Sequence, residues 1–520
     1  MLNSDFTLVP TLWHLPTSDR RFCMSRLPKT FQNPTSFVGA GIALVSLSAI
    51  LVFFAMDVFG STTSPYLGIF TYMLLPGVMV FGLLLIPWGA LLERRRLRKS
   101  GGAERKFLHI DLNKPAHRTA FLIFVVGTMF LMIVSAAGTY QAYNYSESVE
   151  FCGEVCHEVM KPEYVAYQHS PHARVPCAEC HIGTGADWFV KAKISGSYQV
   201  YSVLFNKYSR PIETPVLNLR PARETCEHCH WPEKFSANLE MAKTYFPIDT
   251  TASVPWTIIL QLRIGGGRSE LGSVSGIHWH MSTTHTVEYV AADHKRQVIP
   301  WIRSTDLATG KSKLFRSLEN PMTETERAKH EIRTMDCIDC HNRPSHIYHP
   351  PFRTLNDAMA RNSISQTLPN IRAIASHALT QEYRSEEQAK KEIDNFVRGQ
   401  YNSTAPHILA SRKGDVDAAI VEIQNIHARN FFPEMRVSWQ HYPNNIGHMY
   451  NEGCFRCHDN QHVTDKGEIL SNDCKLCHTI VAQGPKGKVS SEFNGMDFIH
   501  PSDIDGAEKN VKCTECHTGE

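Results

Sequence analysis

Seven pairs of cysteines, each followed directly by a histidine, constrain the fold of this 520-residue chain more than any other feature. Six pairs have the spacing CxxCH, and the first has the longer spacing CxxxCH. Fourteen of the 15 cysteines belong to these pairs and lie after residue 150, which leaves Cys23. The motifs are Cys152/Cys156/His157, Cys177/Cys180/His181, Cys226/Cys229/His230, Cys337/Cys340/His341, Cys454/Cys457/His458, Cys474/Cys477/His478 and Cys513/Cys516/His517.

This spacing fits the covalent attachment of haem. Two thiols one helical turn apart can each add to a vinyl group of one porphyrin, and the next residue delivers its imidazole to the iron. Zinc ribbons and disulfides also use paired cysteines, but seven pairs that are all followed by histidine argue strongly against both. We therefore predict seven covalently attached haem c groups, including one at the longer first motif. Cys23 is expected to be a reduced thiol without a role.

Three long apolar runs precede the motifs. Residues 37–56, 66–92 and 120–138 contain no charged side chain. Each run is long enough to cross about 30 Å of hydrocarbon as a helix, so three transmembrane helices are expected. The second should be kinked by Pro76 and Pro87. None of the runs contains histidine, which excludes a haem held between the membrane helices.

The distribution of charge predicts how the chain crosses the membrane. Residues 1–139 carry 13 basic and 6 acidic side chains, and nine of the basic ones lie in the loop 93–118. By the positive-inside rule the N-terminus and this loop are cytoplasmic, which places everything after the third run in the periplasm. No cleavable signal peptide is evident. The formal net charge of +2 for the whole chain argues against a nucleic-acid partner.

Histidines outside the motifs are numerous enough to ligate every iron from its second side. Seventeen remain in the exported part when the seven motif histidines are set aside. An iron with both axial positions filled transfers electrons, whereas substrate chemistry needs an open position. The composition therefore favours electron transfer. For the last three motifs we favour His448, His462 and His500 over the other candidates, His407, His427 and His441.

The first four motifs resemble the NapC/NirT family of membrane-anchored tetrahaem quinol dehydrogenases. The resemblance covers about residues 150–350 and rests on FCGEVCHEVMKP, SPH, CAECH and CIDCH, which begin at residues 151, 170, 177 and 337. It implies that His172 is the distal ligand of the fourth haem and His346 that of the second. A histidine shortly before the fourth motif should serve the third haem, and the candidates are His330, His278 and His280.

The same resemblance implies a quinol site at the first haem. In the family a methionine follows the first motif, and here Met160 lies three residues after His157 rather than two. Lys193 resembles the quinol-site lysine of the family. The acidic residue expected six positions later is replaced by Gln199. The ligation of the first haem and the acceptance of the quinol proton therefore depart from the family pattern.

Taken whole, the chain resembles the heptahaem inner-membrane quinol-oxidising cytochromes of metal-reducing bacteria. This resemblance implies that the protein oxidises menaquinol from the membrane pool and passes electrons to periplasmic c-type cytochromes. Two alternatives stay open. One is a terminal multihaem reductase of a small oxyanion, although the CxxCK motif of such enzymes is absent. The other is a conduit subunit that accepts electrons from another membrane protein and never binds quinol.

The expected fold is three transmembrane helices followed by a mainly α, loop-rich multihaem region with a small β-hairpin insertion. The hairpin is expected from Thr257–Ile264 and from the alternation at residues 285–303, with a turn at Asp293. Amphipathic helices are expected between residues 354 and 432, where there is no cysteine. The expected parts are a cytoplasmic segment 1–36, an anchor 37–139, a tetrahaem domain 140–350, a helical linker 351–435 and a trihaem domain 436–520.

Overall fold

The computed structural model describes residues 31, 33–59, 74–99, 111–155, 157–183, 185–216, 220–231, 238–248, 254–265 and 275–519. The chain divides into two compact units, Met1–Ser146 and Glu147–Glu520. We describe each unit by itself.

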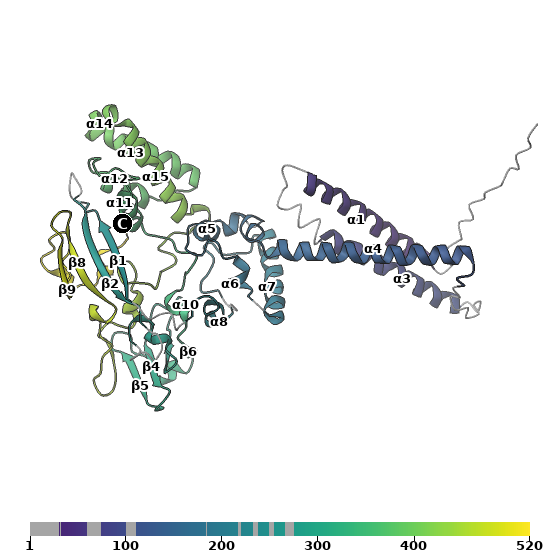
Figure 1. Cartoon of the computed structure of the whole chain (residues 1–520), viewed down its shortest axis with the longest axis horizontal. Coiled ribbons are helices and arrows are strands. Elements are labelled where there is room, and N and C mark those ends of the chain that lie inside the picture. The colour runs from purple at the N-terminus through teal and green to yellow at the C-terminus, as the bar shows by residue number, and fades with distance from the viewer. Residues whose placement is uncertain are drawn as a thin grey trace, which may run out of the picture. The chain divides into compact units, whose positions relative to one another are not determined.

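The first unit contains the three expected apolar helices, α1 (Pro34–Phe59), α3 (Leu75–Lys99) and α4 (Pro115–Ser146) (Figure 1). All three are long and apolar enough to cross a membrane. Glycines let α1 and α3 approach closely, because a Cβ on Gly39 would lie 2.6 Å from the carbonyl oxygen of Gly82. Pro87 lies inside α3, whereas Pro76 stands in its first turn, where a missing N–H breaks no helical hydrogen bond.

The second unit contains two antiparallel sheets (Figure 1). The four-stranded sheet has the order β1 (Asn238–Tyr245), β2 (Trp256–Arg263), β8 (His478–Pro485) and β9 (Ser490–Met496). The five-stranded sheet has the order β6 (Arg333–Thr334), β3 (His285–Val290), β4 (Trp301–Asp306), β5 (Ser312–Ser317) and β7 (His462–Val463). Each sheet therefore joins strands from before residue 350 to strands from after residue 435.

The expected hairpin is present as β3 and β4, and the Arg296 N–H donates to the Asp293 carbonyl in the connecting turn. The β structure is larger than the small insertion that we expected. β2 pairs with β8, and β5 pairs with the two-residue strand β7. Strands of two residues carry no alternating pattern, and pairing between distant segments depends on tertiary contacts, so the sequence could not reveal either sheet in full.

Short helices cluster at the cysteine motifs, and longer helices occupy the cysteine-free segment. Around the first four motifs lie η3 (Phe151–Val155), α5 (His157–Gln168), α6 (Cys177–His181), α7 (Ala186–Leu204), α8 (Ala222–Cys226), η6 (Ile277–Met281), α9 (Glu324–Arg327) and α10 (Cys337–Cys340). The remainder are α11 (Pro351–Ala360), α12 (Ile371–Thr380), α13 (Glu386–Thr404), α14 (Pro406–Ser411), α15 (Lys413–Asn430), η7 (Pro433–Met435), η8 (Gly453–Arg456), η9 (Cys474–Leu476), η10 (Ala507–Lys509) and α16 (Cys513–Cys516).

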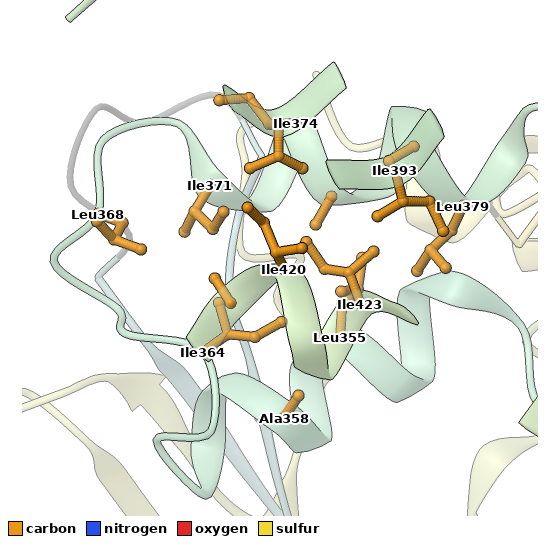
Figure 2. Close-up of a cluster of buried hydrophobic side chains, with 14 of the residues drawn as sticks. Leu355, Ala358, Ile364, Leu368, Ile371, Ile374, Leu379, Ile393, Ile420 and Ile423 are labelled. Atoms are coloured by element: carbon orange, nitrogen blue, oxygen red, sulfur yellow. The ribbon is translucent and has the colours of Figure 1, made fainter. Parts of the chain in front are cut away.

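The largest hydrophobic core lies among helices α11 to α15 (Figure 2). Ile393 and Val397 of α13 are fully buried, as their helical spacing predicted, and belong to one cluster with Ile420 and Ile423 of α15. Ser385 caps α13, and its hydroxyl accepts a hydrogen bond from the Gln388 N–H at 3.1 Å. This segment carries a packed core that needs no haem.

A second core joins α5, next to the first motif, to the chain after α15. Val159 and Ala166 of α5 pack in one cluster with Tyr348, Phe432 and further side chains up to Tyr442. These contacts cross the domain boundaries expected at residues 350 and 435. The assignment of four haems to one domain and three to another stays a prediction.

Candidate functional site

Five of the motifs from the second to the seventh contain a short α- or 3-10 helix, and in the third motif α8 ends at Cys226 and a turn follows. In four of these six motifs the histidine N–H donates to the carbonyl of the first cysteine, at 2.7 Å for His230, 2.8 Å for His341 and His517, and 3.0 Å for His458. One helical turn brings the residues i, i+3 and i+4 to the same face, so both thiols and the imidazole can reach one porphyrin. At the first motif Cys152 lies in η3, while Cys156 and the His157 side chain lie outside the described part.

Not every motif cysteine lies inside the protein. Four of them are exposed, namely Cys180, Cys229, Cys474 and Cys516. Cys229 follows the short helix α8 in a turn, where its N–H donates to the Cys226 carbonyl at 3.1 Å. A motif of one helical turn is too short to be surrounded by other elements, so part of it stays at the surface. Exposure does not exclude attachment, because a thiol must be accessible to the vinyl group that it joins; haem attachment at Cys229 and the other three stays a prediction.

Six motif histidines each face a second imidazole. The distances between ring centres fall between 5.9 and 6.3 Å. The pairs are His181 with His346, His230 with His172, His341 with His278, His458 with His280, His478 with His448 and His517 with His500.

This separation fits two axial ligands on opposite sides of one iron. An imidazole nitrogen lies about 2 Å from the metal ion that it binds, and the ring centre about 1 Å further, so two such rings have centres roughly 6 Å apart. Among the described residues no three His, Cys, Asp or Glu side chains converge as a metal site. A haem iron needs only two protein ligands, because the porphyrin supplies the other four nitrogens. The residues present therefore fit haem.

Backbone carbonyls orient most of the second imidazoles. The Nδ1 atoms of His278, His280, His346 and His500 lie 3.2, 2.8, 3.0 and 2.8 Å from the carbonyl oxygens of Ile264, Ile277, Glu163 and Ser502. His172 Nδ1 lies 3.3 Å from the carbonyl oxygen of Pro344. A hydrogen bond from Nδ1–H leaves Nε2 as the nitrogen that can bind metal.

Burial keeps several of these imidazoles neutral. It lowers the pKa of His346 and that of His478 to about 4. Only neutral imidazole has a lone pair for a metal ion, so these rings are competent ligands at neutral pH. His448 and His478 lie 6.1 Å apart, and neither Nδ1 atom accepts or donates a hydrogen bond to a described residue.

The observed pairs differ in part from those that the family resemblance implied. His346 faces the second motif, as expected. His172 faces His230 of the third motif rather than the fourth, and His278 faces His341 of the fourth rather than the third. His330 is exposed just after α9, and none of the described rings lies against it. The partners of the third and fourth motifs are exchanged because η6, which carries His278, lies beside the fourth motif. The loop that carries His172 then lies beside the third motif.

For the last three motifs the structure brings His280, His448 and His500 into position. His462, which we favoured, instead forms hydrogen bonds within the protein through both ring nitrogens. Its Nδ1 lies 2.9 Å from the Asp459 carboxylate and its Nε2 lies 2.6 Å from the Ile299 carbonyl, so in this structure neither nitrogen is free to bind iron. His280 was considered only for the third haem, because no pattern in the sequence links it to a motif far along the chain.

The fourth and fifth motifs are held together by side chains that the sequence did not single out. Asp339, between the two cysteines of the fourth motif, is buried and accepts a hydrogen bond from Tyr289 Oη at 2.6 Å. Arg296 Nη1 lies 3.3 Å from the same carboxylate. Arg456, inside the fifth motif, donates to the Asp339 carbonyl at 2.9 Å. This network fixes the distance between two successive motifs.

A buried ion pair positions His346. Arg343 Nη2 lies 3.3 Å from Glu163 Oε1, and Arg343 Nε donates to the His346 carbonyl. The Glu163 carbonyl in turn lies against His346 Nδ1. Charge-assisted hydrogen bonds of this kind hold an imidazole rigidly, which favours one orientation of the second axial ligand.

Successive motifs lie next to one another in chain order. A hydrogen bond from Cys152 lowers the pKa of Cys177 to about 7, and a hydrogen bond between Cys226 and Cys337 lowers that of Cys226. Burial raises the pKa of four other motif thiols, and a thiol of a neighbouring motif adds to each rise. These pairs are Cys180 with Cys226, Cys340 with Cys454, Cys477 with Cys454 and Cys513 with Cys474. The six neighbour relations connect all seven motifs.

The residues expected at the quinol site lie on two helices. Met160 is half-buried on α5, and Lys193 lies on α7 with its Nζ 5.0 Å from the centre of the Phe189 ring. Lys193 Nζ also lies 3.8 Å from Glu147 Oε1. Gln199 is on α7 as well, where its amide bonds to Ser195 at 3.5 Å. Residues six apart in a helix point about 120° away from each other, so Gln199 does not share a face with Lys193.

Comparison with known proteins identifies the class. The N-terminal region of the NapC/NirT cytochrome c family matches residues 114–215, which include α4 and the first two motifs. The chain belongs to this family of c-type cytochromes, whose members carry covalently bound haem and transfer electrons. It is 41% identical to the cytochrome c-type protein ImcH of Geobacter sulfurreducens over 93% of this chain and 95% of that protein.

A more distant relative covers a smaller part of the chain. The cytochrome c-type protein NrfH of Wolinella succinogenes is 30% identical over 22% of this chain and 63% of its own length. No solved structure matches the chain. The protein is therefore a membrane-anchored multihaem c-type cytochrome of the NapC/NirT family, similar to ImcH over nearly its whole length.

Proposed function

We propose that this cytochrome is a heptahaem quinol dehydrogenase, which oxidises menaquinol at the first motif and passes the electrons to a periplasmic c-type cytochrome. The observation that carries the proposal is the position of the first motif. The apolar helix α4 ends at Ser146, and η3 with Cys152 begins at Phe151. A haem attached there lies within a few residues of the hydrocarbon in which quinol is dissolved.

Helix α7 supports a site at the membrane surface. Val190, Ile194, Tyr198, Tyr201 and Phe205 follow one another at helical spacing and are between 41% and 68% exposed. Exposed apolar rows with tyrosines and flanking lysines are typical of helices that lie in the lipid interface. Lys193 is next to this row. A quinol that leaves the lipid along α7 would thus reach the ammonium group beside the first motif.

The order of the motifs supports a single route for electrons. Each motif has a cysteine close to a cysteine of the next one, from the first to the seventh. Six of the seven sites present two imidazoles to the iron, which leaves no open position for substrate. These sites relay electrons rather than reduce an oxyanion. We propose that the relay runs from the first motif to the seventh and that the acceptor docks near the C-terminal motifs.

The proposed location follows from charge. The basic residues of the N-terminal segment and of loop 93–118 favour the cytoplasmic side, which places the haem region in the periplasm. All seven motifs are proposed to carry haem. The intact mass of the denatured protein should exceed that of the bare chain by seven haem groups. An excess of six would mean that the Cys152/Cys156 spacing is not used.

The test is the reduction of the purified full-length protein in detergent by menadiol, a soluble naphthoquinol. After mixing with menadiol, we expect the haem absorption spectrum to change to that of the ferrous form. The extent of the change should equal that produced by dithionite. Failure with menadiol, together with full reduction by dithionite, would reject the quinol dehydrogenase and favour the conduit that takes electrons from another subunit.

A lysine pair refines this test. A cation beside bound quinol stabilises the negative charge that develops on its oxygen as the proton leaves. Lys193→Ala should therefore slow reduction by menadiol about tenfold. Lys191, whose Nζ lies 4.4 Å from the Trp188 ring centre, provides the matched control. Equal and small effects of both substitutions would show that Lys193 is an ordinary interfacial lysine.

A further inference from the structure

We propose that Glu147 accepts the protons of the quinol, in place of the acidic residue that is missing at position 199. This inference rests on the proposed function. It assigns a catalytic role to a carboxylate that belongs to none of the motifs and lies on the connection between α4 and η3.

The surroundings of Glu147 suit a proton acceptor. Its side chain is 20% exposed, and Oε1 is shielded from solvent without accepting a hydrogen bond from a described residue. Lys193 Nζ lies 3.8 Å from this atom, which is an ion-pair distance but too long for a hydrogen bond. Oε1 therefore keeps a lone pair next to the cation that stabilises a quinol oxygen, and the partly exposed carboxyl group can take a proton from a hydroxyl group.

The backbone connects Glu147 firmly to the first motif. The neighbouring residue Ser148 accepts two hydrogen bonds from the start of η3. Its Oγ accepts from the Phe151 N–H at 3.1 Å and its carbonyl from the Cys152 N–H at 3.2 Å. The distance between the carboxylate and the first haem attachment is thus set by a short, hydrogen-bonded segment. A group that takes the proton and a group that takes the electron must both be within reach of the same quinol.

The chemistry balances with the haem iron as oxidant. A quinol hydroxyl gives its proton to the Glu147 carboxylate as the O–H bond breaks, and a ferric haem held at the first motif would accept the electron and become ferrous. Lys193 stabilises the oxygen from which the proton leaves. Glu147 then releases the proton to solvent, and the electron moves on to the second motif. A second proton and a second electron follow the same routes, so that one quinol yields one quinone, two protons and two ferrous irons.

The experiment compares Glu147→Gln with Glu150→Gln in the full-length protein in detergent. Gln keeps the size of the side chain but cannot take a proton, and a general base typically contributes 10²-fold or more. We expect Glu147→Gln to lower the maximal rate of haem reduction by menadiol roughly 100-fold, with less than a twofold change in the menadiol concentration that gives half the maximal rate. Glu150 is exposed and also precedes the first motif, and its substitution should leave the rate within twofold.

The outcomes separate this inference from the proposed function. If the wild-type protein is not reduced by menadiol, the proposed function itself fails. If the wild type is reduced and Glu147→Gln is slowed less than tenfold, quinol oxidation stands and Glu147 is not the acceptor. Haem content and reduction by dithionite control for folding. If Glu147→Gln does not load haem, Glu147→Asp replaces it, and a rate above one tenth of wild type is expected because the carboxylate is kept. A lower rate in a fully loaded Glu147→Asp protein would overturn the assignment.

Discussion

A histidine binds iron only through a nitrogen that is free of other bonds, and this rule separates the histidines of the second unit. His500 uses Nδ1 to bond a carbonyl and keeps Nε2 available, and its ring centre lies 5.9 Å from that of His517. His462 uses both nitrogens within the protein. Both residues are close to a motif in the sequence. We therefore expect hydrogen bonds, and not spacing in the sequence, to distinguish an iron ligand from a structural histidine.

We expect His278 and His280 to serve two different haems although they are two residues apart. In the ferric protein each of His278→Ala and His280→Ala should convert one low-spin haem to high spin, and the double variant should convert two. Electron paramagnetic resonance measures these numbers directly. His330→Ala is the matched control and should convert none, because His330 is exposed. A new high-spin signal in His330→Ala, without one in His278→Ala, would identify His330 rather than His278 as the iron ligand.

His462 should be a structural residue. His462→Leu removes the imidazole from the Asp459 carboxylate, which keeps two backbone N–H donors, and leaves the Ile299 carbonyl without its side-chain donor. An unsatisfied buried acceptor typically costs about 1–3 kcal/mol. Denaturant unfolding should therefore show a less stable protein. All haems should stay low spin in the same preparation, whereas one high-spin haem would identify His462 as a ligand after all.

Among the elements, α13 and α15 form a core that was predictable because helical spacing of apolar residues is a local pattern. The burial of a histidine beside this core was not predictable from the sequence. His427 on α15 is buried and stacks on Phe431, with ring centres 5.2 Å apart. In the sequence it was one of several possible iron ligands. Its burial against Phe431 is decided by packing.

The burial of His427 predicts acid sensitivity of these helices. Burial lowers its pKa to about 4, with Glu386 and Glu434 opposing the shift. A histidine that is neutral when folded and protonated near pH 6.5 when unfolded destabilises the fold as the pH falls from about 6.5 to about 4. At about 1.4 kcal/mol per pKa unit the loss is on the order of 3 kcal/mol.

Hydrogen exchange in α13 and α15 measures this effect. Exchange at pH 4.5 should be faster than at pH 7 after correction for the intrinsic rate. His427→Phe keeps the aromatic packing and should remove most of the difference, while a substitution of the exposed His407 by Gln should not. An unchanged pH dependence in His427→Phe would assign the sensitivity to another group.

At the scale of the whole molecule, the two sheets make the region after residue 146 one unit rather than a string of modules. β2 pairs with β8 over most of its length, and β5 pairs with β7. His280 before residue 350 faces His458 after it. Both sheets and one imidazole pair therefore form only when the segments before residue 350 and those after residue 435 are present in the same chain.

This arrangement predicts that residues 1–350 do not form a stable tetrahaem protein. Truncation after residue 350 exposes the edges of β2 and β5 and removes all buried partners of Val159 and Ala166 in their cluster except Tyr348. We expect the truncated chain to carry fewer than four haems and to be cleaved by protease under conditions in which the full chain resists. Four haems and full resistance would instead show that the first four motifs fold independently.

By itself the sequence determined the motif histidines, the three apolar helices and the family, because motif spacing and apolar length are properties of short segments. It also placed the first motif next to the end of the third apolar helix. The tertiary structure alone decided which second histidine faces which motif, why His462 faces none, and that Glu147 stands beside Lys193 where Gln199 does not. These outcomes depend on contacts between segments far apart in the chain, and such contacts follow from packing and strand pairing rather than from local pattern.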